Sequence, residues 1–359
     1  MKCVKLWMSA AVLVVLAAVF CADTFAGQEG HYTGGIIRPR DVAVPEPGLY
    51  YTQYNPVYTS NQFRDRNGVK VTGMAMQRDI VKTIDIYGYH VDFIADVNAS
   101  ADVKIEVDSF GMMPTFIWVT KQKLFGAKYG MFIQPYFGYE KIKVEADLDA
   151  SVDPMLEVRG YGIRLPGQEA KRSVSKSSSR FDIGDMYVQP IWLGWSGNHY
   201  DLAFDYGFFA PTGGYNKNNL VNIGKGFWSH IMQVGGLYYP NPNKSTALMG
   251  QWTYELNGCM HGQDIRPGDN IIFEYGLSQY LTTWLEIGFM GFDIWEVTQD
   301  HGMQATGKNA KDQDHAIGAM ISVWPIQNKL NVSFRATKEV YTKDRFKGDW
   351  YTATVTYVF

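Results

Sequence analysis

The last ten residues of the chain, Trp350 to Phe359, constrain the fold most strongly. Apolar and aromatic residues occupy every second position, and threonines occupy the positions between them as far as Thr356. Side chains in a β-strand alternate between two faces, so this stretch forms a strand with one apolar and one hydroxyl face. A soluble sheet buries the apolar face, whereas an outer-membrane barrel turns it to lipid and points the polar face into the lumen.

The same alternation recurs through the second half of the chain. Tyr200 to Phe208 and Leu330 to Ala336 place apolar residues on one face and acids, small residues or Arg335 on the other. An Arg or Lys side chain that faces lipid at mid-depth costs about 2–4 kcal/mol. The position of Arg335 on the polar face therefore favours a barrel. The predicted lumen-lining residues are Asp201, Asp205, Glu255, Glu274, Glu286, Asn331 and Arg335. They either line a permeation path or satisfy one another inside a packed barrel.

Strands and connections alternate in a regular way from residue 103 onwards. The candidate strands lie at residues 49–58, 103–120, 128–144, 185–195, 200–210, 228–239, 246–256, 271–280, 284–295, 315–324, 330–341 and 350–359. Connections alternate between short turns and long loops, as in outer-membrane barrels with short periplasmic turns and long extracellular loops. We therefore predict an all-β fold, an antiparallel transmembrane barrel of about 12 strands. Fourteen strands result if Thr83 to Ala95 and a neighbouring segment also cross.

The beginning of the chain predicts export. Residues 1–26 have a charged start, an apolar run and the small-x-small sequence Thr24-Phe25-Ala26, which together indicate a signal peptide. A lipoprotein signal would use Cys21, but the bulky Phe20 before it opposes that cleavage. Only Cys259 then remains, which excludes an internal disulfide. Residues 27–48 are rich in proline and lack periodicity, so we predict an irregular periplasmic lead-in before a barrel domain at residues 49–359.

Tryptophans lie close to both the short turns and the long loops, as in the two aromatic girdles of a spanning barrel. The predicted girdle consists of Trp118, Trp195, Trp228, Trp284, Trp295, Trp324 and Trp350. No later stretch holds about 18 consecutive apolar residues, so a transmembrane helix in the mature chain is not expected. The C-terminal residues Tyr351, Val355, Tyr357 and Phe359 resemble the signal that the barrel-assembly machinery reads.

The sequence offers little sign of catalysis, cofactor or metal. The histidines are scattered, and neither Gly-x-Ser-x-Gly nor His-Glu-x-x-His occurs, so we expect no enzyme. The acids and histidines between Asp293 and His315 are either a calcium site or a solvated loop, and no ligand spacing supports the former. Asp147 to Phe181 is expected to be a long surface loop, and its basic run Lys171 to Arg180 either touches a polyanion or is solvated.

Several sequence blocks resemble the MetA-pathway phenol-degradation family. They include Pro47 to Tyr50, Leu124 to Gly130, Gly184 to Tyr187 and Phe209 to Gly213, together with the aromatic C terminus. The chain departs from the family pattern at residues 74–100, which resemble an insertion and are expected to extend the first hairpin outside the membrane. The resemblance implies an outer-membrane transporter barrel and the passage of hydrophobic or aromatic compounds.

These features predict a monomeric channel of the bacterial outer membrane for passive uptake of small hydrophobic or aromatic compounds. The alternative is a closed structural or surface-interaction barrel. The expected partners are outer-membrane lipids, the barrel-assembly machinery during biogenesis, and the solutes themselves. A formal net charge of -3 argues against a nucleic-acid partner, which would call for a clustered basic surface.

Overall fold

The computed structural model describes residues 29–86, 89–158, 161–305 and 310–359. The predicted signal peptide lies outside these residues and stays a prediction. Among the described residues, one compact unit, the barrel unit, consists of residues 29–70, 106–142 and 178–359. A second, the hairpin unit, consists of residues 71–105 and 143–177 apart from the gaps. No helix in the described ranges is long and apolar enough to cross a membrane.

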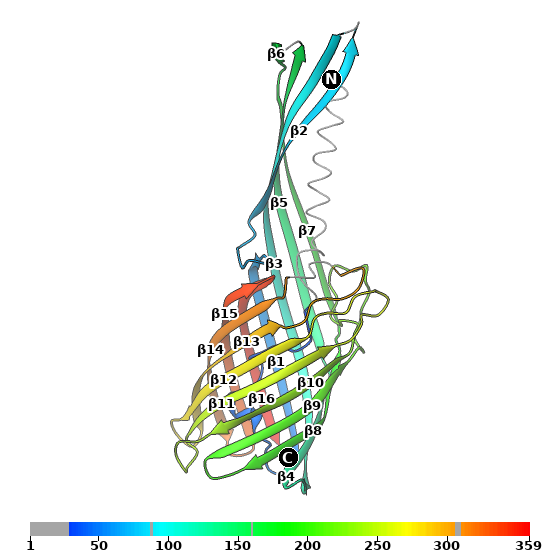
Figure 1. Cartoon of the computed structure of the whole chain (residues 1–359). Coiled ribbons are helices and arrows are strands. Elements are labelled where there is room, and N and C mark those ends of the chain that lie inside the picture. Colours follow the sequence, from blue (N-terminus) through cyan, green and yellow to red (C-terminus); the bar gives the residue numbers. More distant parts are fainter. Residues whose placement is uncertain (1–28, 87–88, 159–160, 306–309) are drawn as a thin grey trace. The chain divides into compact units, whose positions relative to one another are not determined.

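The barrel unit is built around a closed ring of twelve antiparallel strands, which confirms the predicted number. Figure 1 shows β8 to β16 following one another around the ring in chain order. The ring closes because β1 pairs with β16 on one side and with residues 107–119 of β3 on the other. Its strands are β1 (Gly48–Arg64), β3 (Tyr89–Leu124), β4 (Ala127–Gln134), β8 (Met186–Ser196), β9 (Tyr200–Ala210), β10 (Ser229–Tyr238), β11 (Thr246–Asn257), β12 (Asn270–Tyr280), β13 (Leu285–Glu296), β14 (Gln313–Ile326), β15 (Leu330–Lys343) and β16 (Arg345–Val358).

The barrel packs inside out, as the alternation predicted. On β9, Leu202 and Phe204 are 51% and 41% exposed, whereas Asp201 and Ala203 are 7% and 2% exposed. On β16, Tyr351 is exposed and Thr352 is buried. Apolar side chains therefore cover the outside, where lipid is the favourable solvent for them, and polar side chains face the interior.

Connections between the later strands alternate in length as far as β15, as expected. Residues 197–199, 281–284 and 327–329 form short turns, while residues 211–228, 258–269 and the described part of 297–312 form long loops. The last connection departs from this alternation, because only residue 344 separates β15 from β16. The predicted strand 128–144 is wrong in one respect, because it is divided into β4 and β5 (Phe137–Val158) at Pro135 and Tyr136. Proline has no N–H to donate to the ladder, so the strand is interrupted there. Both halves pair with β3, but their other partners differ, because β4 pairs with β8 and β5 pairs with β7.

Residues 29–47, here called the N-terminal segment, lie against the inward face of the barrel strands. Val42 and Val44 pack with Val119 of β3 and Trp192 of β8 in one buried apolar cluster. Arg40 reaches Glu286 of β13 with 2.7 Å between Nε and Oε1. The described part of this segment is therefore not the periplasmic lead-in that its prolines suggested. Inward carboxylates and apolar wall residues supply the partners that hold an irregular chain inside the barrel.

The hairpin unit contains β2 (Gly73–Ile86), β6 (Tyr161–Arg164) and parts of β3, β5 and β7 (Gln168–Ile183). β2 and β3 form an antiparallel hairpin in which residues 73–86 pair with residues 89–102. The segment that was expected to extend the first hairpin is therefore itself a β-hairpin. Its location outside the membrane stays a prediction. The prediction of a long surface loop at Asp147 to Phe181 is wrong, because strands β5, β6 and β7 occupy most of it. Small apolar residues such as Ala146 and Leu148 alternate with aspartates on β5 and pack near Val174 of β7, which stabilises strands within a polar sequence.

Candidate functional site

All seven predicted lumen residues are buried inside the barrel wall. Their exposed fractions run from 7% for Asp201 to zero for Glu255 and Asn331. They come from β9, β11, β12, β13 and β15, so the polar faces of five strands converge on one interior. The structure brings them together, while their role in permeation stays a proposal.

Two of the inward acids hold the start of the N-terminal segment. Glu255 accepts the backbone N–H groups of His31 and Tyr32 through Oε1, at 2.5 and 3.1 Å. Glu274 accepts the Tyr32 hydroxyl at 2.5 Å and the Gly35 N–H at 2.9 Å. Gly34 allows this close approach, since a Cβ there would lie 2.5 Å from Cγ of Phe292. The segment thus satisfies carboxylates that were expected either to line a path or to pair with one another.

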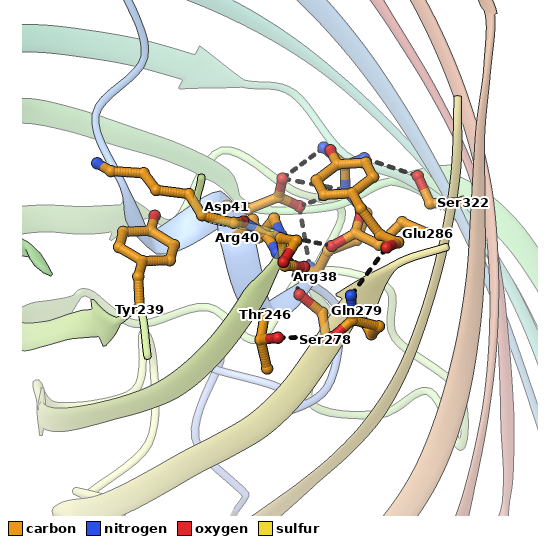
Figure 2. A network of polar contacts seen from close by, with 12 residues as sticks. Arg38, Arg40, Asp41, Tyr239, Thr246, Ser278, Gln279, Glu286 and Ser322 are labelled. Atoms are coloured by element: carbon orange, nitrogen blue, oxygen red, sulfur yellow. Dashed lines mark hydrogen bonds and ion pairs between the residues drawn. The ribbon is translucent and has the colours of Figure 1, made fainter. Parts of the chain in front are cut away.

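Arginines on either side of Pro39 fix the next part of the segment. Arg40 donates to Glu286 at 2.7 Å and to Ser278 at 2.9 Å through Nε, and its guanidinium lies 4.6 Å from the centre of the Tyr280 ring. Its remaining nitrogens donate to the carbonyl oxygens of residues 244 and 245, each at 3.0 Å. Figure 2 shows Arg40 directed at Glu286 and Ser278, and the short 3-10 helix η2 (Pro39–Val42) sets the direction of the side chain. The guanidinium is therefore held on several sides by the wall.

Arg38 makes a second connection to the wall. It donates through Nη1 to Ser322 at 3.2 Å and to Asn331, and it forms an ion pair with Asp41 of its own turn at 2.6 Å (Figure 2). Asp41 orients the guanidinium, because its carboxylate also accepts the Arg38 backbone N–H at 2.9 Å. The two arginines consequently connect η2 to strands β12, β13, β14 and β15.

His31 connects the segment to the opposite part of the wall. Its Nε2 lies 2.8 Å from Asp185 and its Nδ1 lies 2.7 Å from Ser229, while the ring stacks on Phe209 at 4.8 Å. Lys225 donates to the carbonyl oxygens of residues 29 and 30. Sequence reasoning missed His31, Arg38, Arg40, Asp185 and Lys225. An available signal was the charge of the predicted lumen, in which five acids faced the single base Arg335 and so required further cations.

The N-terminal segment leaves a cavity of about 490 Å³ beside it in the barrel unit. The segment contributes one wall through Tyr32 and Ile37, and the barrel strands contribute the others, with most of their lining residues on β1, β3, β4, β8 and β9. The wall mixes aromatic rings with hydroxyls, amides and charged groups of both signs, and its members include Tyr54, Thr115, Phe132, Gln134, Tyr187, Gln189, Trp192 and Asp205. This amphipathic composition is typical of sites for small organic molecules.

Five of the seven predicted girdle tryptophans face outward. Trp118, Trp228 and Trp284 are about half exposed, and Trp195 and Trp295 share the outward register of Leu202 and Trp252. Trp324 and Trp350 are wrong as girdle residues, because they occupy inward positions and line the cavity. Trp350 donates through Nε1 to buried Glu339 at 2.9 Å, and Trp324 to Tyr280 at 3.3 Å. Their indole N–H groups thus find partners in the polar interior.

The C-terminal residues predicted as an assembly signal form the outward face of β16. Tyr351 and Val355 are 40% and 38% exposed, and Phe359 is 76% exposed beside the Tyr357 ring at 4.9 Å. We expect a chain lacking Phe359 to accumulate less in the outer membrane and to refold normally in detergent, because the exposed ring contributes little packing. Cell fractionation and detergent refolding measure the two effects. Phe359→Tyr is the matched control, and normal membrane levels of the truncated chain would contradict the assembly role.

The acids between Asp293 and His315 form neither of the expected arrangements. Among the described residues no group of three or more acids, histidines or cysteines is placed to hold a metal ion. Asp300 and Asp312 are buried rather than solvated, and Asp314 on β14 is buried as well. Asp300 accepts the Gly268 N–H at 2.8 Å, and Asp312 lies 3.4 Å from Arg345. Backbone donors and one arginine therefore organise the loop that precedes β14.

Asp312 makes this loop sensitive to pH. Burial raises its pKa to about 7, although Arg345 opposes the rise. Between about pH 4 and pH 7 the folded chain keeps a proton that an unfolded aspartate loses, so this carboxyl makes the fold less stable as pH rises. We expect the melting temperature to fall less between pH 4.5 and pH 8 in Asp312→Asn than in the wild type, as measured by circular dichroism in detergent. An identical pH dependence would contradict this assignment.

A closed antiparallel barrel with an apolar outside and a polar inside is a bacterial outer-membrane barrel. A sequence model of the family described as "Putative MetA-pathway of phenol degradation" matches residues 91–354, and the chain belongs to that family. The match starts after the block at Pro47 to Tyr50, so this part of the resemblance lies outside it. The search of curated proteins returned no match.

Solved structures resemble the chain in fold. The COG4313 outer membrane channel from Pseudomonas putida F1 has a TM-score of 0.59 at 11% identity, over 90% of this chain and 100% of that one. A Pseudomonas aeruginosa FadL homologue has 10% identity over 92% and 96% of the two chains, and its TM-score of 0.34 carries no weight. The likeness to the first of these structures shows the fold of this chain, an outer-membrane barrel.

Proposed function

We propose that the protein is a passive channel for small hydrophobic or aromatic compounds. The observation that carries this proposal is the cavity of about 490 Å³ between the N-terminal segment and the wall. Phe132, Tyr187 and Trp192 offer aromatic surface there, while Gln134 and Thr115 offer polar groups. Such a lining accepts a ring with one polar substituent better than a fully hydroxylated sugar, which would leave hydroxyl groups against aromatic faces.

The N-terminal segment is the candidate gate of this path. It forms one wall of the cavity and is held by hydrogen bonds and ion pairs rather than by a continuous strand. Polar contacts of this kind can exchange with water when the segment moves, so the lumen widens without any change to the barrel ladder. Passage in this mechanism needs neither a cofactor nor an energy source.

A closed, surface-interaction barrel is the second candidate. The observation that favours it is the number of separate anchors on the segment, since His31, Arg38 and Arg40 each reach a different part of the wall. A segment anchored in this way can act as a permanent core. The long loops would then carry the function.

Solute flux distinguishes the two candidates. The mature chain is refolded into liposomes, and entry of catechol is compared with entry of a sugar of similar size and with entry into empty liposomes. Faster entry of catechol than in empty liposomes, without a matching rise for the sugar, is the expected result. No added flux of either solute through a folded barrel would reject the channel and favour the closed barrel.

A further inference from the structure

Asp205 differs from the four other acids that were predicted to line the lumen. Asp201, Glu255, Glu274 and Glu286 all accept hydrogen bonds from tyrosine, backbone or arginine donors. Asp205 is 4% exposed, and its Oδ1 has no hydrogen-bond partner among the residues that the structure describes. A buried acceptor without a donor is costly, so its retention in a native interior requires an explanation.

The neighbours of Asp205 do not supply the missing donor in this structure. Gln233 lies beside it on β10, but its Nε2 already donates to Tyr32 at 3.0 Å and to Thr253 at 2.9 Å. The hydroxyl of Tyr187 donates to Gln189 at 3.0 Å. Both nearby donors are therefore committed elsewhere, and the free acceptor remains at the cavity wall.

Aromatic rings surround this acceptor. Trp192 lies beside Asp205 on the other side, on β8, and Phe132 contacts both Trp192 and Tyr187, with centroid distances of 6.0 and 5.6 Å. The Tyr187 ring covers Gly207, two residues along β9 from Asp205, where a Cβ would come within 2.3 Å of the tyrosine hydroxyl. The cavity thus presents ring surfaces and a hydrogen-bond acceptor side by side.

We propose that Asp205, Trp192, Tyr187 and Phe132 form a subsite for an aromatic ring that carries an O–H or N–H donor. The ring packs on the aromatic side chains, and its hydroxyl or amine donates to Oδ1 of Asp205. A benzoate-type anion is disfavoured, because it brings a second carboxylate to the carboxyl group. This inference rests on the proposed channel function and assigns its solute selectivity to one residue.

Equilibrium binding tests the subsite independently of transport. Ligand-observed NMR compares phenol, aniline and anisole, the methyl ether that lacks the donor, on the refolded full mature chain in detergent. We expect phenol and aniline to bind several-fold more tightly than anisole. The Asp205→Leu variant should bind the three compounds about equally, and Asp205→Asn should keep the preference because its amide oxygen still accepts.

Asp201→Asn is the matched control, because Asp201 lies on the same face of β9 and is held by Tyr239 at 2.5 Å, outside the cavity wall. This variant should keep the preference for phenol. Equal binding of phenol and anisole by the wild type, or an unchanged preference in Asp205→Leu, would overturn the subsite. Melting by circular dichroism checks the fold, and Asp205→Leu should melt no lower than the wild type because it removes an unpartnered acceptor.

The two proposals fail in distinguishable ways. Selective phenol binding that depends on Asp205, without catechol flux, would reject the channel and retain the subsite. Catechol flux through a chain that binds phenol and anisole equally well would support the channel and reject the subsite.

Discussion

A chain in which residues 29–47 are replaced by a flexible glycine and serine sequence of equal length should conduct ions far better than the intact chain. The replacement removes the arginines and His31 that attach the segment to the wall, while the barrel ladder is untouched. Without the ordered segment, the interior of a twelve-stranded barrel is intermediate in width between those of small filled barrels and open porins. We therefore expect the conductance to rise by about tenfold or more. Recording in planar bilayers measures the change.

The same recordings should show cation selectivity. Without Arg38 and Arg40 the lumen keeps Glu255, Glu274 and Glu286 with few cations to balance them. Rings of carboxylates favour cations in a water-filled path. The reversal potential in a salt gradient reports the selectivity. Unchanged conductance in a folded replacement variant would show that the segment does not close the barrel.

Breaking the contact between Arg40 and Glu286 should have the second largest effect. Glu286→Leu leaves the Arg40 guanidinium mostly buried without its carboxylate, and removal of one partner of a buried pair costs about 3–5 kcal/mol. Arg40→Met combined with Glu286→Leu removes both charges, so most of that stability should return. Urea unfolding in detergent measures Glu286→Leu, Arg40→Met and the double variant as a double-mutant cycle. The network that they change is the one in Figure 2.

Conductance adds a functional measurement to this cycle. If the segment is the gate, Glu286→Leu should open more often than the double variant, because only the single change leaves a charge that is more stable in water. Asp201→Asn serves as the control, since Asp201 contacts Lys244 and Tyr239 rather than the segment. Equal stabilities of Glu286→Leu and the double variant would contradict the cost assigned to the unpaired guanidinium.

The repeated alternation allowed most of the barrel to be predicted. One face of a strand must meet lipid and the other must not, so Leu202, Phe204 and Arg335 could be assigned to a face from their spacing alone. The length of each connection followed from where the alternation stopped. The hairpin unit was harder, because its strands carry alanines, serines and aspartates that resemble loop sequence, and their stability depends on pairing with distant strands.

The alternation of polar and apolar positions identified the lumen residues but not their partners. Trp324 and Trp350 illustrate the limit, since proximity to a chain turn suggested a girdle, while the strand register turned both rings inward toward Tyr280 and Glu339. A tryptophan near a strand end fits either position. The direction of the side chain is decided by one residue of register, which the sequence near a turn does not mark.

The sequence by itself determined the period of two, the apolar outer face and the positions of the inward acids, because these depend on local spacing. The tertiary structure alone decided that residues 29–47 enter the barrel, and that Asp205 keeps a free acceptor while Glu255, Glu274 and Glu286 do not. An irregular segment has no periodicity to show its location. Its place is set by complementary charges more than 200 residues away in the chain, which meet only when the barrel closes.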